Sequence, residues 1–189
     1  MGFYSPSQLI QDARRHKLNV LPVCINNSDW SHSLDLNYQP PALRLGLRLV
    51  KGVSQESSLR LMKSRNKSLI TSIHDLKRRK IFNQKEFMKL VNANAFQEFD
   101  SNRRHAYWQS LQMDDGLGTQ NTKPAGFIKA LTPVENMLLD YRNARGVSLD
   151  YHPMQLLRNR HPFKRCVTAN HLLTPVSYTH LTLPTTPYV

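Results

Sequence analysis

Apolar residues recur at helical spacing in several stretches of the chain, and each stretch begins with a residue that can cap a helix. In Ser5–Gln8 a capping serine precedes a proline at the first helical position, and the glutamine completes a capping box. Leu9, Ile10 and Ala13 then share one face. The pattern predicts a helix at the start of the chain.

The same signals predict further helices downstream. After Ser54 an acidic first turn leads into Leu59 and Met62, which are spaced to lie on one face. A last short helix is predicted near Pro153, with Met154 turned inward. The other predicted helices follow caps at Ser72, Asn83, Ser101 and Thr132.

Two segments have the pattern of strands instead. Val20–Ile25 is rich in β-branched residues, and its internal proline favours an edge position. From Ala42 the chain alternates strictly, with leucines at every second position up to Leu49, which predicts a strand with one buried face. Residues 26–41 between them are polar and rich in turn formers, with Trp30 and Tyr38 as expected anchors. The predicted fold is mainly α, with a small α/β element first.

The junction at residues 49–54 carries the most informative local pattern. A glycine, an apolar residue and a helix start in succession are typical of a helix-hairpin-helix, whose backbone amides approach a phosphate. Nearby lysine and arginine side chains would add charge. An ordinary glycine turn explains the pattern equally well. The candidate DNA-backbone-binding residues are Lys51, Gly52, Val53, Ser54, Lys63 and Arg65.

A second, more degenerate hairpin is predicted within Phe87–Phe99, with Ala93–Ala95 at its turn. Asn94 tolerates the left-handed conformation that such a turn needs. Packing alone explains this copy, so it is the poorer phosphate site. The basic runs at 78–80 and 103–105 are solvated faces by default, and Tyr107 and Trp108 are more typical of a core than of base stacking.

The net charge restricts the possible binding partners more than the residue composition does. The 189 residues hold 26 lysines and arginines against 13 acidic residues, a net charge of +13. This excess favours polyanions, namely DNA, RNA or anionic lipid, with nucleic acid first. No apolar run approaches the roughly 20 residues of a membrane span, and no secretory signal is visible, so we expect a cytoplasmic protein without membrane contact. Two distant cysteines indicate free thiols.

The pattern offers no catalytic centre. No nucleophile elbow, zinc-protease motif or phosphate-binding loop occurs in the sequence. Asp114 and Asp115 are adjacent, so their side chains point apart in a glycine-rich stretch. We therefore predict no catalytic residue, metal site or cofactor within this chain.

The end of the chain differs in composition from everything before it. Residues 176–185 carry no charged side chain and match, residue for residue, one reading frame of a common sequencing adapter. We interpret residues 176–189 as read-through of such an adapter, which excludes them from reasoning about the fold. On this interpretation the natural protein continues with different residues, and Met1 is an equally arbitrary start.

Several of these segments, taken in order, resemble one known family. The matching segments are residues 2–16, Asn26–Trp30, Ala42–Gly52, Asp140–Arg142 with 146–149, and His152–Pro153. They are similar to the error-prone, damage-inducible branch of the C-family bacterial DNA polymerases, the DNA polymerase III alpha subunits. The resemblance runs from Met1 to about Leu173.

The resemblance implies a fragment of an enzyme that extends a primer past damaged template positions. Its acidic palm would hold two Mg²⁺ ions and would lie upstream of Met1, so none of its residues is assigned here. The chain would comprise the end of the fingers region (1–41), a tandem helix-hairpin-helix module that binds DNA (42–112), a linker (113–130), a helical segment leading to a missing OB domain (131–175) and the adapter-derived residues (176–189).

The sequence also departs from that family. Lys17, Ser54 and Asn94 stand where glycine is usual, and Gln109–Met113 is only a degenerate echo of a clamp-binding pentapeptide, so sliding-clamp binding is not favoured. Two alternatives stay open: a free-standing helix-hairpin-helix DNA-binding protein, and a docking module for other mutasome proteins. Binding to the duplex backbone, independent of its sequence, is the expected role.

Overall fold

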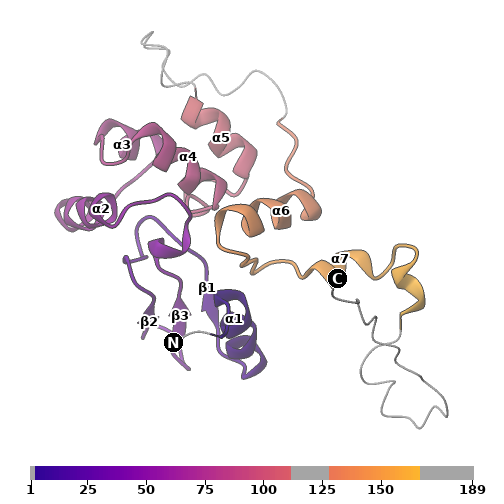
Figure 1. Ribbon diagram of the computed structural model, residues 1–189. Coiled ribbons are helices and arrows are strands. Elements are labelled where there is room, and N and C mark those ends of the chain that lie inside the picture. Colours follow the sequence, from indigo (N-terminus) through magenta and orange to yellow (C-terminus); the bar gives the residue numbers. More distant parts are fainter. Residues whose placement is uncertain (1–2, 112–127, 167–189) are drawn as a thin grey trace, which may run out of the picture. The chain divides into compact units, whose positions relative to one another are not determined.

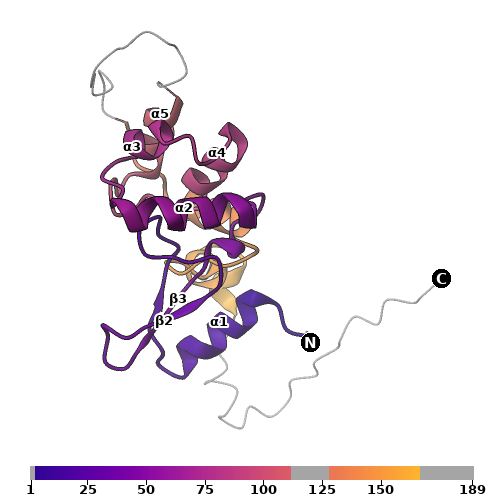
Figure 2. The same cartoon turned by 90° about the vertical axis from the view of Figure 1, so that its left-hand side faces the viewer.

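The computed structural model describes residues 3–111 and 128–166. The chain divides into two compact units, residues 1–153 and residues 154–189. Within the first unit, a three-stranded sheet with helix α1 adjoins a cluster of helices α2 to α5 (Figures 1 and 2). The fold is mainly helical with a small α/β element, as the sequence predicts.

Helix α1 (Pro6–Arg15) begins with the predicted capping box. The Ser5 amide donates to Gln8 Oε1 at 2.8 Å, and the Gln8 amide donates back to Ser5 Oγ at 3.3 Å. Ile10 is the buried residue of this helix, whereas Leu9 is 58% exposed. One of the predicted inward residues therefore faces outward.

The sheet has the order β1-β3-β2, formed by β1 (Val20–Leu21), β2 (Ser33–Asp35) and β3 (Ala42–Arg44). Strand β1 pairs parallel to β3, and β2 pairs antiparallel to it. The first strand is shorter than predicted and lies at an edge, as a segment followed by Pro22 must. Strand β2 falls in the polar segment rich in turn formers, where the sequence pattern predicts no strand, and Tyr38, an expected anchor there, is 41% exposed.

The predicted long strand from Ala42 to Leu49 is wrong in its second half. The strand ends at Arg44, and the 3-10 helix η1 (Leu47–Leu49) follows. Gly46 lies between them, where an added Cβ would be only 2.4 Å from the Ser31 carbonyl carbon. This close approach lets the Leu47 amide donate to Asp29 O at 2.8 Å, so the chain turns inward and buries its leucines without continuing the ladder.

Four helices form the larger cluster: α2 (Gln55–Lys67), α3 (Ile73–Arg78), α4 (Gln84–Asn92) and α5 (Arg103–Leu111). Ser54, Ser72 and Asn83 cap the first three, as predicted. The predicted cap of the fourth is wrong by one residue, because the Asn102 side chain, not that of Ser101, accepts from the first-turn amides of α5.

Helix α2 does not bury the face that its leucine and methionine spacing predicts. Leu59 is 44% exposed, while Leu61 is fully buried beside Ser57 and Ser58. Small polar side chains therefore face the core, and both serines form hydrogen bonds there. The core extends through both parts of the unit, from Ile25 and Leu45 to Leu90 and Phe96.

Helix α6 (Pro133–Asn143) has the predicted capping box between Thr132 and Glu135. The second unit is described up to Cys166. It contains most of α7 (Pro153–Leu157) and the 3-10 helix η2 (Phe163–Arg165). Met154 is 38% exposed, so its predicted inward position is wrong. Within the described ranges, no helix combines the length and the apolar character needed to cross a bilayer. The adapter-derived residues 176–189 and nearly all of the predicted linker lie outside the described residues.

Candidate nucleic-acid interface

The predicted hairpin at Lys51–Ser54 joins η1 to α2. Gly52 has a φ of +85°, in the left-handed region that favours glycine. Val53 is 8% exposed, so its side chain anchors the hairpin in the core. Lys51 and Gly52 are exposed on the outside of the turn.

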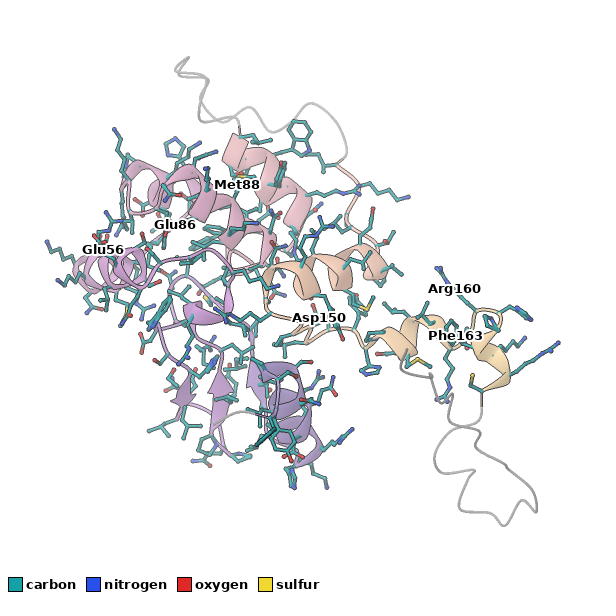
Figure 3. All side chains as sticks on the ribbon, in the orientation of Figure 1. Glu56, Glu86, Met88, Asp150, Arg160 and Phe163 are labelled. Atoms are coloured by element: carbon teal, nitrogen blue, oxygen red, sulfur yellow. The ribbon has the colours of Figure 1, made fainter. Side chains whose placement is uncertain are left out.

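Two other helices hold the hairpin in place. The Lys51 amide donates to the carbonyl of Asn143, at the end of α6, at 2.8 Å. The Ser54 amide donates to Glu86 Oε1, and Ser57 Oγ donates to Glu86 Oε2, both at 2.9 Å. Glu86 belongs to the start of α4 and also completes the capping box with Asn83; Figure 3 labels it there.

Glu86 is charged in this position. Burial would raise the pKa of its carboxyl group, but hydrogen bonds from Ser54, Ser57 and the Asn83 amide outweigh burial and lower it. The carboxylate accepts from the Ser54 amide, one of the donors at the hairpin that an external anion could otherwise use. The Ser54 amide, a predicted phosphate donor, is thus already used inside the protein, which corrects that part of the prediction.

The Gly52 amide remains available. Among the residues that the structure describes, it donates to no protein acceptor. The amides of Gln55 and Glu56 begin α2 and, like the first amides of any helix, have no partner within it. An anion at the hairpin would meet these donors on the exposed side of Gly52.

Lysine side chains border the same turn. Lys51 is exposed in the hairpin itself. Lys89, on α4, runs past Gly52, with its Cγ and Cε atoms 3.6 Å and 3.9 Å from the position of a Cβ on that glycine. Sequence reasoning missed Lys89 because only the packing of α4 against α2 brings it to the hairpin. Lys63 is exposed further along α2.

Arg65 is not a free cation, contrary to the prediction. Its guanidinium group donates to the carbonyls of Ile25 and Ser28, at 3.3 Å and 2.6 Å, and forms an ion pair with Asp29. Its side chain is only 11% exposed. The residue fastens α2 to the loop after β1, and the hairpin surface therefore does not include it.

The second predicted hairpin has the expected backbone. Asn94 has a φ of +59°, and Ala95 is 1% exposed. The Ile25 amide donates to Ala95 O at 3.1 Å, and Phe96 packs with its ring centroid 5.4 Å from that of Phe87. These contacts account for the turn by packing; that it is the poorer phosphate site stays a prediction.

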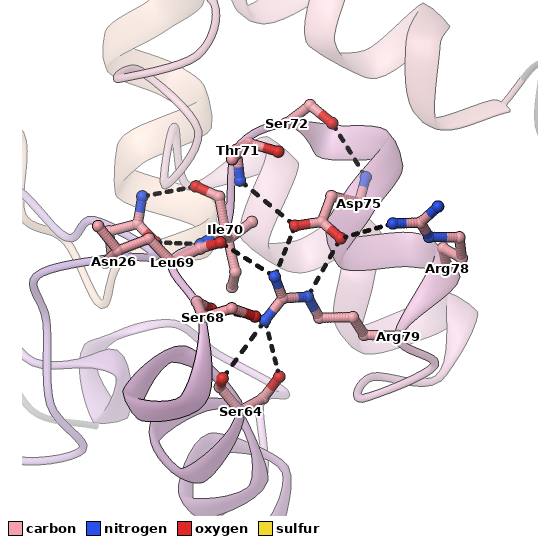
Figure 4. Close-up of polar contacts among 10 residues, drawn as sticks. All are labelled: Asn26, Ser64, Ser68, Leu69, Ile70, Thr71, Ser72, Asp75, Arg78 and Arg79. Atoms are coloured by element: carbon pink, nitrogen blue, oxygen red, sulfur yellow. Dashed lines mark hydrogen bonds and ion pairs between the residues drawn. The ribbon is translucent and has the colours of Figure 1, made fainter.

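Most of the arginines in the two basic runs are engaged inside the protein. Arg79 pairs with Asp75 at 2.7 Å and donates to Ser64 and to the carbonyls of Ser68 and Leu69, which joins α3 to the end of α2 (Figure 4). Its guanidinium group also lowers the pKa of the Asp75 carboxyl.

The arginines of the basic run on α5 are also paired with acidic side chains. Arg103 pairs with Asp140 at 2.6 Å, and Arg104 with Glu135 at 2.8 Å. The default prediction of solvated faces is wrong for Arg79 and Arg103. Tyr107 and Trp108 are 37% and 50% exposed, so the default prediction that they belong to the core is wrong as well.

The described residues include no group of three or more histidine, cysteine or acidic side chains that could hold a metal ion. Asp114 and Asp115 lie outside the described residues. Of the clamp-like pentapeptide, Gln109–Leu111 belongs to α5, and Ser110 is fully buried. The chemistry that this unit offers is therefore hydrogen bonding and positive charge at an exposed turn.

The sequence of this unit has counterparts among known proteins. Residues 17–106 match the family model described as a helix-hairpin-helix motif. The match includes both hairpins and helices α2 to α4. The larger part of the first unit is thus a helix-hairpin-helix domain.

Comparison with curated proteins gives a narrower result. The chain is 38% identical over 172 residues to the error-prone DNA polymerase of Teredinibacter turnerae, covering 88% of this chain and 17% of that protein. It is 42% identical over 164 residues to that of Vibrio campbellii (83% and 16%) and 36% identical over 191 residues to that of Idiomarina loihiensis (97% and 18%). The chain corresponds in sequence to a segment of error-prone DNA polymerases and spans about a sixth of their length.

Proposed function

We propose that this chain binds the backbone of duplex DNA, without sequence preference, as part of an error-prone DNA polymerase that acts in translesion synthesis. The observation that carries the proposal is the exposed Gly52 turn, with its available amide between the side chains of Lys51 and Lys89. Amide donors and a positive charge at a helix start are what a phosphodiester recognises.

Each group has a distinct task in this proposal. Gly52 lets the backbone approach a phosphate oxygen, Val53 keeps the turn rigid by packing, and the two lysines, together with Lys63, neutralise charge. Ser54 contributes through the cap of α2. Base edges carry sequence information, and none of these groups reaches for them, so affinity would be uniform across sequences.

The polymerase activity belongs, in this proposal, to the whole protein. The relatives are named error-prone DNA polymerases, and this chain spans only about 17% of their length. DNA-directed nucleotide transfer with Mg²⁺ would take place in a palm outside this chain. We accordingly expect the purified 189-residue chain to bind DNA and to extend no primer.

Fluorescence anisotropy with labelled 20-base-pair duplexes of several sequences tests the proposal. The double substitution Lys51→Gln with Lys89→Gln should weaken binding to all of them alike. It should also reduce the slope of log affinity against log salt by about 2, because roughly one phosphate contact is lost per lysine.

Lys67→Gln is the matched control. It removes one positive charge from the exposed last residue of α2, roughly 18 Å along the helix from its start, and should leave both affinity and slope nearly unchanged. Equal losses in the control and the double variant would refute the hairpin interface. A flat salt dependence of the wild type would favour a module that docks other mutasome proteins.

A further inference from the structure

A second basic surface lies between α3 and the start of α4. A pocket of about 560 Å³ opens there. Four basic side chains line it, His74, Lys77, Arg78 and Lys80, together with Phe82 and Gln84. None of these residues belongs to the hairpin at Lys51–Ser54.

Basic side chains dominate the described lining of this pocket. Among the residues that the structure describes, no carboxylate lines it, and the nearby Asp75 pairs with Arg79 and has a side chain that is only 11% exposed. Arg78 lies 3.4 Å from Asp75 Oδ1 but is 76% exposed. Lys77 donates to Ser110 O at 2.8 Å. An anion in the pocket would meet Arg78 and Lys80, both of which are exposed.

An aromatic surface adjoins these charges. Phe82 is half-buried and packs against the hydrophobic core, while Phe87, which also lines the pocket, is 2% exposed. Phe82 is thus held firmly while part of its ring stays accessible. Cations beside a fixed aromatic ring are the combination with which proteins bind single-stranded nucleic acid, because the phosphates and the bases are both exposed.

We propose that this pocket binds one nucleotide of a single-stranded DNA segment, with its phosphate against Arg78 and Lys80 and its base against Phe82. The choice of DNA rests on the proposed function; the pocket chemistry itself calls for a phosphodiester next to an unpaired base. The hairpin would hold duplex while the pocket holds unpaired strand, so the two sites discriminate between forms of DNA.

The backbone at Lys80 permits a clean variant. Lys80 has a φ of +50°, and asparagine is among the residues that tolerate this region best. Lys80→Asn therefore removes the charge without adding strain. Phe82→Leu keeps an apolar side chain against the core but removes the flat ring.

The test measures anisotropy of the full chain with a labelled single-stranded DNA 12-mer and, separately, with the 20-base-pair duplex. Phe82→Leu should weaken single-strand binding roughly fivefold or more, as loss of one stacked base does. The pair Arg78→Gln with Lys80→Asn should lower the salt slope for single strands by about 0.7, because the two side chains contact one phosphate. Duplex affinity should stay within about twofold of wild type in both variants.

Photocrosslinking locates the contact directly. A 12-mer with 5-iodouracil should crosslink within the peptide that carries Phe82. Crosslinks confined to Tyr107 or Trp108, or unchanged single-strand affinity in both pocket variants, would overturn the proposal. Tighter binding of an RNA 12-mer would overturn the choice of DNA.

The hairpin variant Lys51→Gln with Lys89→Gln separates the two proposals. If it weakens duplex and single-strand binding equally while the pocket variants weaken neither, the pocket adds nothing. If it leaves duplex binding intact while the pocket variants weaken single-strand binding, the proposed hairpin function fails and the pocket stands.

Discussion

At the scale of single residues, a few backbone positions decide the shape of the basic surface. Gly52 and Gly146 have φ values of +85° and +81°, and four side-chain-bearing residues share that region: Lys17, Lys80, Asn94 and Arg145. The left-handed conformation costs a residue with a Cβ about 1–2 kcal/mol. The chain therefore carries strain at several turns where glycine would carry none.

Gly52→Ala should lower the free energy of unfolding by about 1–2 kcal/mol, because a backbone with a φ of +85° is strained in a residue that has a Cβ. The added Cβ would clash with no neighbouring atom, because the nearest one, Lys89 Cγ, lies 3.6 Å from its position. Urea denaturation measures the loss. Gly146→Ala is the matched control for strain, since a Cβ there meets nothing within 4 Å. If Gly52→Ala alone is neutral, the turn does not hold the left-handed backbone.

At the scale of elements, the helices are the part that sequence reasoning predicts well. Caps such as Ser5, Ser72 and Asn83 act within three residues of themselves, so the local sequence is sufficient. The prediction of a strand up to Leu49 is wrong although the leucines repeat with period two. The backbone hydrogen-bond partners of the second half of this segment lie outside the sheet. Only the approach of Gly46 to Ser31, across the fold, ends the ladder.

The candidate site is likewise predicted where it depends on neighbours in the chain and missed where it depends on distant contacts. The sequence indicates the Gly52 turn and its exposed Lys51, since both are neighbours in the chain. It misses Lys89 and misassigns Arg65, because their roles depend on contacts with residues about 37 positions away in each case. The acceptor for the Ser54 amide was unpredictable for the same reason.

The contact between α2 and α4 predicts a pH dependence. Glu86 has a pKa below its ordinary value of 4.5, so its contribution to stability is complete above about that pH and is lost as the pH falls through the folded-state value. Glu86→Gln should cost about 1.5 kcal/mol near neutral pH.

The difference between wild type and Glu86→Gln should shrink in acid, as urea denaturation across the pH range would measure. Glu56→Gln provides the comparison, because Glu56 is an exposed residue of the first turn of α2. A deficit that stays constant from neutral to acidic pH would show that the charge of Glu86 is not what joins the helices.

At the scale of the whole first unit, one buried ion pair joins α5 to α6. Arg103 and Asp140 are 2.6 Å apart, with side chains 5% and 12% exposed. Burial raises the pKa of the Asp140 carboxyl, and the charge of Arg103 offsets only part of that effect. Ser148 Oγ also donates to this carboxylate at 3.0 Å.

Arg103→Ala should lower the free energy of unfolding by about 3–5 kcal/mol near neutral pH, because it leaves a buried carboxylate without its partner. A raised carboxyl pKa penalises the folded state increasingly as the pH rises above the unfolded value of 3.8. The deficit should therefore be smaller at about pH 4 than at about pH 7.5, as urea denaturation at the two pH values would measure.

Arg104→Ala is the matched control for that substitution. Arg104 and Glu135 are 40% and 43% exposed, and such surface pairs contribute about 0–1 kcal/mol. Equal effects of the two substitutions would contradict the structural role of the buried pair.

The shared carboxylate of Glu86 has a consequence for how the DNA-facing turn opens. The Ser54 amide and the Asn83 amide at the start of α4 donate to the same carboxylate, which is 32 positions from Ser54 in the sequence. When either helix start frays, the other loses its hydrogen bonds to this carboxylate. We therefore expect the opening of the two starts to be coupled, so that the stability of the hairpin depends on a helix that begins far beyond it in the chain.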